Sequence, residues 1–159
     1  MAEGKPDLVA YCGIYCGDCL GYTGVIADGA EAFARVLDRY QFGRTAAGIF
    51  PEELADYDRF REILSFMTDL HCSGRCRIAE GKAVPTGCAV RVCCIEKGFY
   101  ACHECDEFES CDTLRKLHGQ LHYDACLRNL RSMRQKGLEA WLLEGPRHCY
   151  WQEERDDRT

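Results

Sequence analysis

Apolar side chains recur with a helical period on both sides of a middle segment that has no such period. Before that segment, one set follows the i, i+3, i+4, i+7 spacing of a buried helix face; its members are Ala30, Phe33, Ala34 and Leu37. Asp28 and Glu31 resemble a capping box for this helix, and Gly43 is suited to its end. A second helix is expected to begin at Pro51, with an apolar face of Leu54, Tyr57, Leu64 and Met67.

The helical pattern returns after Cys111. Asp112 is a suitable N-cap, and a helical period then continues as far as Gly137 through Tyr123, Cys126, Leu127 and Leu130. A last helical segment, LEAWLL, is expected to stop at Gly145–Pro146. Cys126 belongs to the apolar face of this pattern, so we expect a buried thiol that binds no metal.

The middle segment, residues 72–111, holds eight cysteines, four glycines and one proline. It buries too little carbon to fold by the hydrophobic effect alone, so a bound metal or a crosslink must stabilise it. Short β-strands are expected at 89–92 and 99–101. The predicted fold class is therefore mainly α, with a small irregular or β cysteine-rich segment.

We expect one domain over residues 1–159. Its parts are an N-terminal cysteine knuckle (1–28), a helical pair (29–70), the cysteine-rich metal-binding segment (71–111), C-terminal helices (112–145) and a tail (146–159).

Cysteine usage is the compositional feature that changes this picture most, with 13 cysteines among 159 residues. An odd number cannot pair completely in disulfides. The sequence shows no secretory leader and no stretch of roughly 18 uncharged apolar residues, so we expect a cytoplasmic protein without a membrane span. In a reducing cytosol, clustered thiols more often bind metal than form disulfides.

A net charge of −6 gives little reason to expect nucleic-acid binding.

The stretch YCGIYCGDC, from Tyr11 to Cys19, has the spacing C-x3-C-x2-C. This spacing fits an iron–sulfur cluster, a structural metal or a disulfide. Radical S-adenosylmethionine enzymes share it, but they usually have an aromatic residue where this chain has Asp18, and they need a large α/β barrel. A catalytic thiolate among these cysteines would need an acid–base partner, and none is identifiable in the sequence. A metal site is the leading interpretation.

A two-cysteine, two-histidine zinc finger is a rival interpretation, because Cys102, Cys105, His118 and His122 have the spacing C-x2-C-x12-H-x3-H. Gly119 between the histidines and four acidic residues beside the base-reading surface argue against it. Cys94 is set aside as a ligand, because adjacent residues seldom both reach one small ion. Cys149 has no assigned role.

The order CGIYCGDC, CSGRC, GCAVRVC, EKGFYACHECDEFESC and GLEAWLLE resembles a family of small bacterial and archaeal cysteine-rich proteins, catalogued as a domain of unknown function. The resemblance runs from about Tyr11 to Glu144. It implies a metal-binding protein, with zinc as the presumed ion and no established reaction. Ser110 departs from the family, which often has proline there. The resemblance leaves out Cys94, Cys126 and Cys149, and it lacks the histidine pair.

The sequence therefore predicts a metal-binding protein with Zn²⁺ in structural thiolate sites, acting as a scaffold for a protein partner or in a redox-linked role. The alternative is an iron–sulfur protein with a [4Fe–4S] cluster for electron transfer or redox sensing. The oligomeric state is left open. Matched residue by residue, the family resemblance implies these metal ligands: Cys12, Cys16, Cys19, Cys72, Cys76, Cys88, Cys93, Cys102, Cys105 and Cys111.

Overall fold

The computed structural model describes residues 4–72, 76–77, 88–149 and 151, apart from the side chains at 118–121. These residues form seven α-helices and four short 3-10 helices, and the described part of the chain contains no β-strand. The mainly helical fold class is thus confirmed. The expected strand at 89–92 is wrong, because these residues lie in helix α5 (Ala89–Glu96), and residues 99–101 are irregular.

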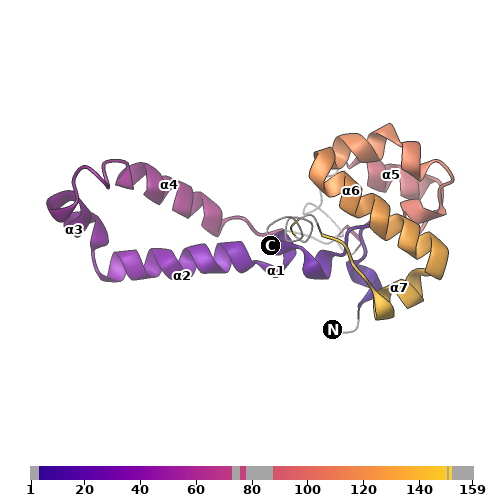
Figure 1. Ribbon diagram of the computed structural model, residues 1–159, viewed down its shortest axis with the longest axis horizontal. Helices are drawn as coiled ribbons and strands as arrows, with labels where there is room; N and C mark the ends of the chain where they lie inside the picture. Colours follow the sequence, from indigo (N-terminus) through magenta and orange to yellow (C-terminus); the bar gives the residue numbers. More distant parts are fainter. Residues whose placement is uncertain (1–3, 73–75, 78–87, 150, 152–159) are drawn as a thin grey trace, which may run out of the picture. The chain divides into compact units, whose positions relative to one another are not determined.

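The chain divides into two compact units (Figure 1). We call residues 20–72 the hairpin unit, and residues 1–19 together with 73–159 the cysteine-rich unit. The expectation that the whole chain acts as one domain stays a prediction.

The hairpin unit contains α1 (Leu20–Thr23), α2 (Val25–Arg39), α3 (Phe42–Ile49) and α4 (Tyr57–Thr68). Helices α2 and α4 lie side by side (Figure 1), and Ala30, Leu37 and Leu64 form their buried core. These positions confirm the predicted apolar faces. Phe33 differs from the prediction, because 49% of its surface is exposed.

The helix boundaries in the hairpin unit differ from those predicted. Helix α2 begins at Val25, before Asp28, so the expected capping box does not form. Gly43 lies inside α3, and the turn before α3 is made at Gln41, whose φ is 47°. Helix α4 starts at Tyr57 rather than Pro51. The ring of Phe42 packs on that of Tyr57, with centroids 5.8 Å apart, so tertiary packing outweighs the low helix propensity of glycine.

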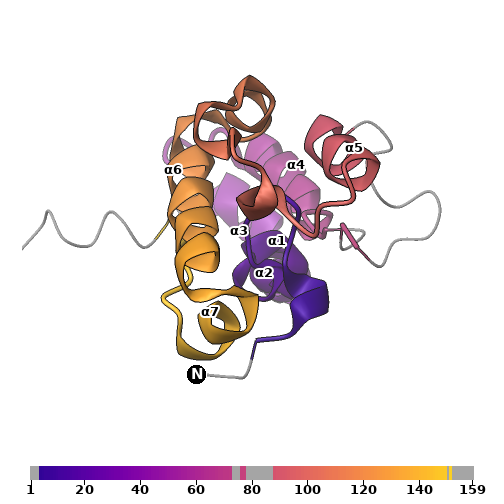
Figure 2. The same ribbon diagram turned by 90° about the vertical axis from the view of Figure 1, so that its right-hand side faces the viewer.

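The cysteine-rich unit is built around α6 (Asp112–Lys136), which is followed by α7 (Leu138–Glu144). The two helices pack on each other (Figure 2), and Trp141 of α7 is fully buried. Helix α6 ends at Gly137 and α7 at Gly145, as predicted from the sequence. Four 3-10 helices complete the unit: Pro6–Leu8, Cys16–Asp18, Cys102–Glu104 and Phe108–Ser110.

The N-terminal cysteine knuckle is held against α6 at Gly13. This glycine has φ 92°, and a Cβ atom built on it would lie 2.7 Å from Cγ of Leu130. The turn is closed by the Gly13 N–H, which donates to the carbonyl oxygen of Ala10 at 3.0 Å. Glycine is therefore required here both by the backbone conformation and by the close approach of α6.

We predict that Gly13→Ala lowers the free energy of unfolding by about 2–4 kcal/mol, because a positive φ and a clash with α6 add together. Gly98→Ala is the matched control. Its φ is also positive, at 68°, but no atom lies within 4 Å of the added Cβ, so about 1–2 kcal/mol is expected. Urea denaturation of both variants measures the difference, and equal losses would contradict the close packing at Gly13.

Candidate metal centre

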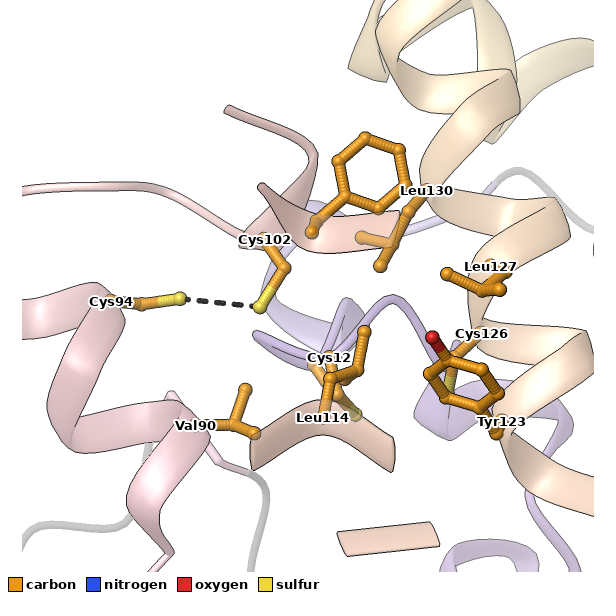
Figure 3. Packing of buried hydrophobic residues seen from close by; sticks show 11 residues of the cluster. Cys12, Val90, Cys94, Cys102, Leu114, Tyr123, Cys126, Leu127 and Leu130 are labelled. Carbon is orange, nitrogen blue, oxygen red and sulfur yellow. Dashed lines mark hydrogen bonds between the residues drawn. The ribbon is translucent and has the colours of Figure 1, made fainter. Parts of the chain in front are cut away.

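Nine of the thirteen cysteines belong to one core in the cysteine-rich unit, as far as the described residues go. Four are buried members of it: Cys12, Cys94, Cys102 and Cys126. Five are partly buried and pack against it: Cys16, Cys76, Cys88, Cys105 and Cys111. Cysteine side chains thus take many of the core positions that aliphatic and aromatic side chains would fill in an ordinary domain of this size. Figure 3 shows how residues of α5, α6 and the N-terminal segment meet there.

Cys94 and Cys102 form a pair of thiols in direct contact. Their sulfur atoms are 3.6 Å apart and share a hydrogen bond (Figure 3). This distance is far beyond the roughly 2.05 Å of a disulfide. Two sulfurs bound tetrahedrally to one zinc ion at about 2.3 Å lie about 3.8 Å apart. The observed spacing is therefore close to that of two ligands of one metal ion.

A pocket of about 350 Å³ opens beside this pair. Its wall contains five cysteines from α5 and from the segment leading into α6: Cys93, Cys94, Cys102, Cys105 and Cys111. The backbone of that segment is ordered by short turns, in which the N–H of Cys105 donates to Cys102 O at 3.0 Å. The C-x2-C spacing of Cys102 and Cys105 therefore occupies one 3-10 turn that presents both thiols to the same pocket.

The two thiols of the close pair differ electrostatically. The hydrogen bond with Cys102 lowers the pKa of Cys94, and the Arg77 guanidinium lowers it further against the opposing effect of burial. The same hydrogen bond raises the pKa of Cys102, and burial and the neighbouring thiols add to this. Of the two, Cys94 is therefore the thiol that loses its proton more readily. A thiolate is the form of cysteine that binds metal.

Arg77, the residue after Cys76, binds to this part of the protein through stacking contacts and hydrogen bonds. Its guanidinium lies between two aromatic rings, 4.4 Å from the ring centre of Tyr11 and 3.7 Å from that of Tyr100. It also donates hydrogen bonds to the carbonyl oxygens of Val9 and Tyr100, each at 2.5 Å. Such contacts add cation–π attraction to charge-assisted hydrogen bonds. They place a fixed positive charge near thiols that become negative on binding metal.

Cys126 and Cys12 form a second buried pair. A hydrogen bond with Cys12 raises the pKa of Cys126, and burial raises it further. Cys126 is fully buried on α6, so the expectation of a buried thiol is confirmed. That it binds no metal stays a prediction.

Cys19 lies apart from the thiol-lined pocket. It shares a small cavity of about 10 Å³ with His122, His148 and Cys149. The C-terminal segment reaches this place because Arg147 forms an ion pair with Asp18 at 2.8 Å. The backbone of His148 is also held by two hydrogen bonds to the buried Asn129 side chain, at 2.8 and 2.9 Å. Cys149, which had no role in the sequence analysis, is therefore a neighbour of Cys19.

The zinc-finger spacing does not correspond to one described site. His122 lines the cavity with Cys19, whereas Cys102 and Cys105 line the thiol-rich pocket. The side chain of His118 lies outside the described residues. His103, next to Cys102, is half-buried, and burial lowers its pKa, so its imidazole is neutral at physiological pH.

Three predicted ligands are not members of the core cluster: Cys19, Cys72 and Cys93. Cys72 is the last residue of the hairpin unit and is exposed, and its N–H donates to Gly21 O at 2.7 Å. Cys93 lines the pocket but is only half-buried. None of the thirteen cysteines, all of which are described, is part of a disulfide.

Sequence reasoning set Cys94 aside, although the structure puts it in the core. A helical signal was available, because Val90 and Cys94 are four residues apart and both are buried on α5. Cys94 was set aside because it adjoins Cys93, without weighing this period.

The donor set fits a soft, thiophilic metal. Sulfur ligands favour zinc or iron–sulfur clusters over oxygen-preferring ions such as Mg²⁺. In the described residues, no three His, Cys, Asp or Glu side chains are arranged to hold one metal ion as they stand. Binding would therefore draw the pocket thiols together as they lose their protons.

Fold and core together define a small, helical, thiol-rich protein. The chain belongs to the family described as "Protein of unknown function (DUF3795)", whose model matches residues 8–116. All ten predicted ligands lie within the matched range, and Cys126 and Cys149 lie beyond it. No curated protein and no solved structure matches the chain. Among the described residues, no helix has both the length and the apolar character that a membrane crossing needs.

Proposed function

We propose that this protein binds Zn²⁺ through cysteine thiolates and that the ion joins α5 to the segment leading into α6. The observation that carries the proposal is the pocket lined by five cysteines, two of them with sulfurs 3.6 Å apart. Cys94, Cys102, Cys105 and Cys111 are the four ligands that the geometry favours for this site. A tetrahedral zinc site takes four such ligands and contributes directly to folding.

Cys94 is favoured over Cys93 for a physical reason. Neighbouring residues on a helix point about 100° apart, so both rarely reach one ion. Cys94 is 2% exposed and touches Cys102, whereas Cys93 is half-buried. Cys93 then remains beside the site as a thiol able to take part in redox chemistry or metal exchange. Cys12, Cys16, Cys76 and Cys88, which lie in or against the same core, are candidates for a second ion.

The proposed role is a metal-stabilised scaffold in the cytoplasm that serves a protein partner. Reduced cysteines suit that compartment, and the acidic chain offers little attraction to nucleic acid. We propose no reaction for this site.

An iron–sulfur protein for electron transfer or redox sensing is the second candidate. The specific observation in its favour is that the pocket offers five sulfurs and about 350 Å³, more room than one ion with its ligands needs. Cys102, Cys105 and Cys111 would hold a [4Fe–4S] cluster together with one further thiolate.

Cobalt substitution tests the proposal. Apo-protein prepared without oxygen is titrated with Co²⁺, whose visible spectrum reports tetrahedral coordination and whose charge-transfer bands report thiolate ligands. We expect a four-thiolate tetrahedral spectrum that saturates at a fixed stoichiometry and is displaced by Zn²⁺. Six-coordinate, oxygen-type spectra would contradict the proposal. Protein that is brown as purified, with iron and labile sulfide, would favour the second candidate instead.

A further inference from the structure

The hairpin unit carries an aromatic pocket of about 450 Å³. Four rings on its wall pack edge to face or tilted against one another in the order Phe33, Phe60, Tyr57, Phe42. Their successive centroids are 6.2, 6.0 and 5.8 Å apart. Rings locked together in this way form a preorganised apolar surface, which lowers the entropy cost of binding.

Apolar side chains continue from the pocket along the helices. Ile26 and Phe33 lie seven residues apart on α2, so they share one stripe of its surface, and Tyr40 follows directly after the last residue of the helix. They are 36%, 49% and 68% exposed. On α4, Ile63 lies one turn from Phe60 and is 46% exposed. Several exposed apolar side chains on two neighbouring helices are typical of a protein interaction site.

The rim of the pocket is negatively charged. Glu53 and Asp56 line it, and neither forms an ion pair within the described residues. Three arginines of the unit are already engaged with other acids: Arg35 with Glu31 at 2.7 Å, Arg59 with Glu62 at 2.6 Å and Arg61 with Asp38 at 2.7 Å. Acidic side chains outnumber basic ones by nine to five in residues 20–72. The two rim carboxylates are thus available to a cationic partner.

We propose that this pocket docks a basic, amphipathic segment of a partner protein. An apolar side chain of the partner enters the pocket and packs on the rings of Phe33 and Phe60, and Lys or Arg side chains of the same segment lie beside Glu53 and Asp56. The charge argues for this occupant. A second copy of the chain would bring the same uncompensated acids together, and an anionic membrane surface would be repelled. The inference does not depend on the proposed metal site, which lies in the other unit.

The test uses the full chain and a fluorescent synthetic peptide that forms an amphipathic helix, with Leu and Phe on one face and Lys and Arg on the other. Binding is followed by fluorescence anisotropy. We expect saturable binding that weakens as salt is raised, and about 30-fold weaker binding to Phe60→Ala, as for a central interface residue. Glu53→Lys combined with Asp56→Lys should slow association and reduce the salt dependence.

Two controls keep the result interpretable. Phe66→Ala removes a ring from the same helix that is 66% exposed but does not line the pocket, and it should bind the peptide as the parent does. The same peptide with Glu in place of Lys and Arg should not bind. Circular dichroism and metal content should match the parent in every variant, which separates a failure here from a failure of the metal proposal.

The proposal would be overturned by three results. The first is equal binding of the acidic and basic peptides. The second is an equal effect of Phe66→Ala and Phe60→Ala. The third is that the basic peptide does not bind. In that case, self-association abolished by Phe60→Ala would point to a second copy of the chain as the occupant, and binding to anionic vesicles would point to a membrane surface.

Discussion

Removing the bound metal with a strong chelator, under reducing conditions, is expected to unfold the cysteine-rich unit. Nine cysteines lie in or against its core. Without a metal, the apolar contacts alone must compensate for the conformational entropy that the chain loses on folding. Structural zinc sites contribute on the order of 10 kcal/mol of folding free energy, which is comparable to the entire stability of a small domain. Trp141 is fully buried beside Tyr15, with ring centroids 6.3 Å apart, so its fluorescence should shift to the red.

The specificity of this effect is checked by adding ions back. Zn²⁺ should restore the Trp141 emission and the helical circular dichroism, whereas Mg²⁺, which prefers oxygen ligands, should not. A chain that keeps its emission and its denaturation midpoint after every metal ion has been removed would show that the core is stable without coordinated sulfur.

Replacing Cys94 by serine is expected to remove one equivalent of metal, whereas Cys93→Ser should retain it. The sulfur of Cys94 lies 3.6 Å from that of Cys102, so its loss breaks the favoured four-thiolate set. Changes next to a metal ligand already weaken binding by about 10–100-fold, so losing a ligand should weaken it by at least about 100-fold. Competition with a chromophoric chelator measures the affinity of each variant.

Two further variants bracket this comparison. Cys105→Ser should lose metal as Cys94→Ser does and should disorder the segment before α6. Cys126→Ala should keep the metal, since this thiol is fully buried on α6 and outside the thiol-lined pocket. Metal loss from Cys93→Ser but not from Cys94→Ser would show that Cys93 is the ligand, as predicted from the sequence, and that Cys94 is not. Loss from Cys126→Ala would extend the site to α6.

The period of the apolar residues predicted those helices that bury one face and expose the other. In α6, the positions Tyr123, Cys126, Leu127 and Leu130 were predicted as one face and are buried together. The ends of α6 and α7 followed from Gly137 and Gly145, because glycine adopts the backbone conformations that end a helix. The same glycine rule failed at Gly43, where packing of Phe42 and Tyr57 extends helical structure through the residue.

The candidate site was only partly predictable, because spacing identifies cysteines that are close in sequence and not those that meet in space. Cys102 and Cys105 were found from their C-x2-C spacing, and they share a pocket. Cys94 was missed because it adjoins Cys93 and adjacent residues seldom both reach one ion, although it lies on the buried face of a helix. The neighbourhood of Cys19 and Cys149 depends on contacts between distant segments, such as the Arg147–Asp18 ion pair, which no local pattern encodes.

Elemental analysis of the full chain, purified without oxygen and with all thiols kept reduced, tests the central claim most directly. We expect a whole-number stoichiometry of at least one zinc ion per chain, with no disulfide detected by mass spectrometry of the alkylated protein. Folded protein without any bound metal, or with cysteines joined as S–S pairs, would contradict the view that thiolate-bound metal holds the cysteine-rich unit together.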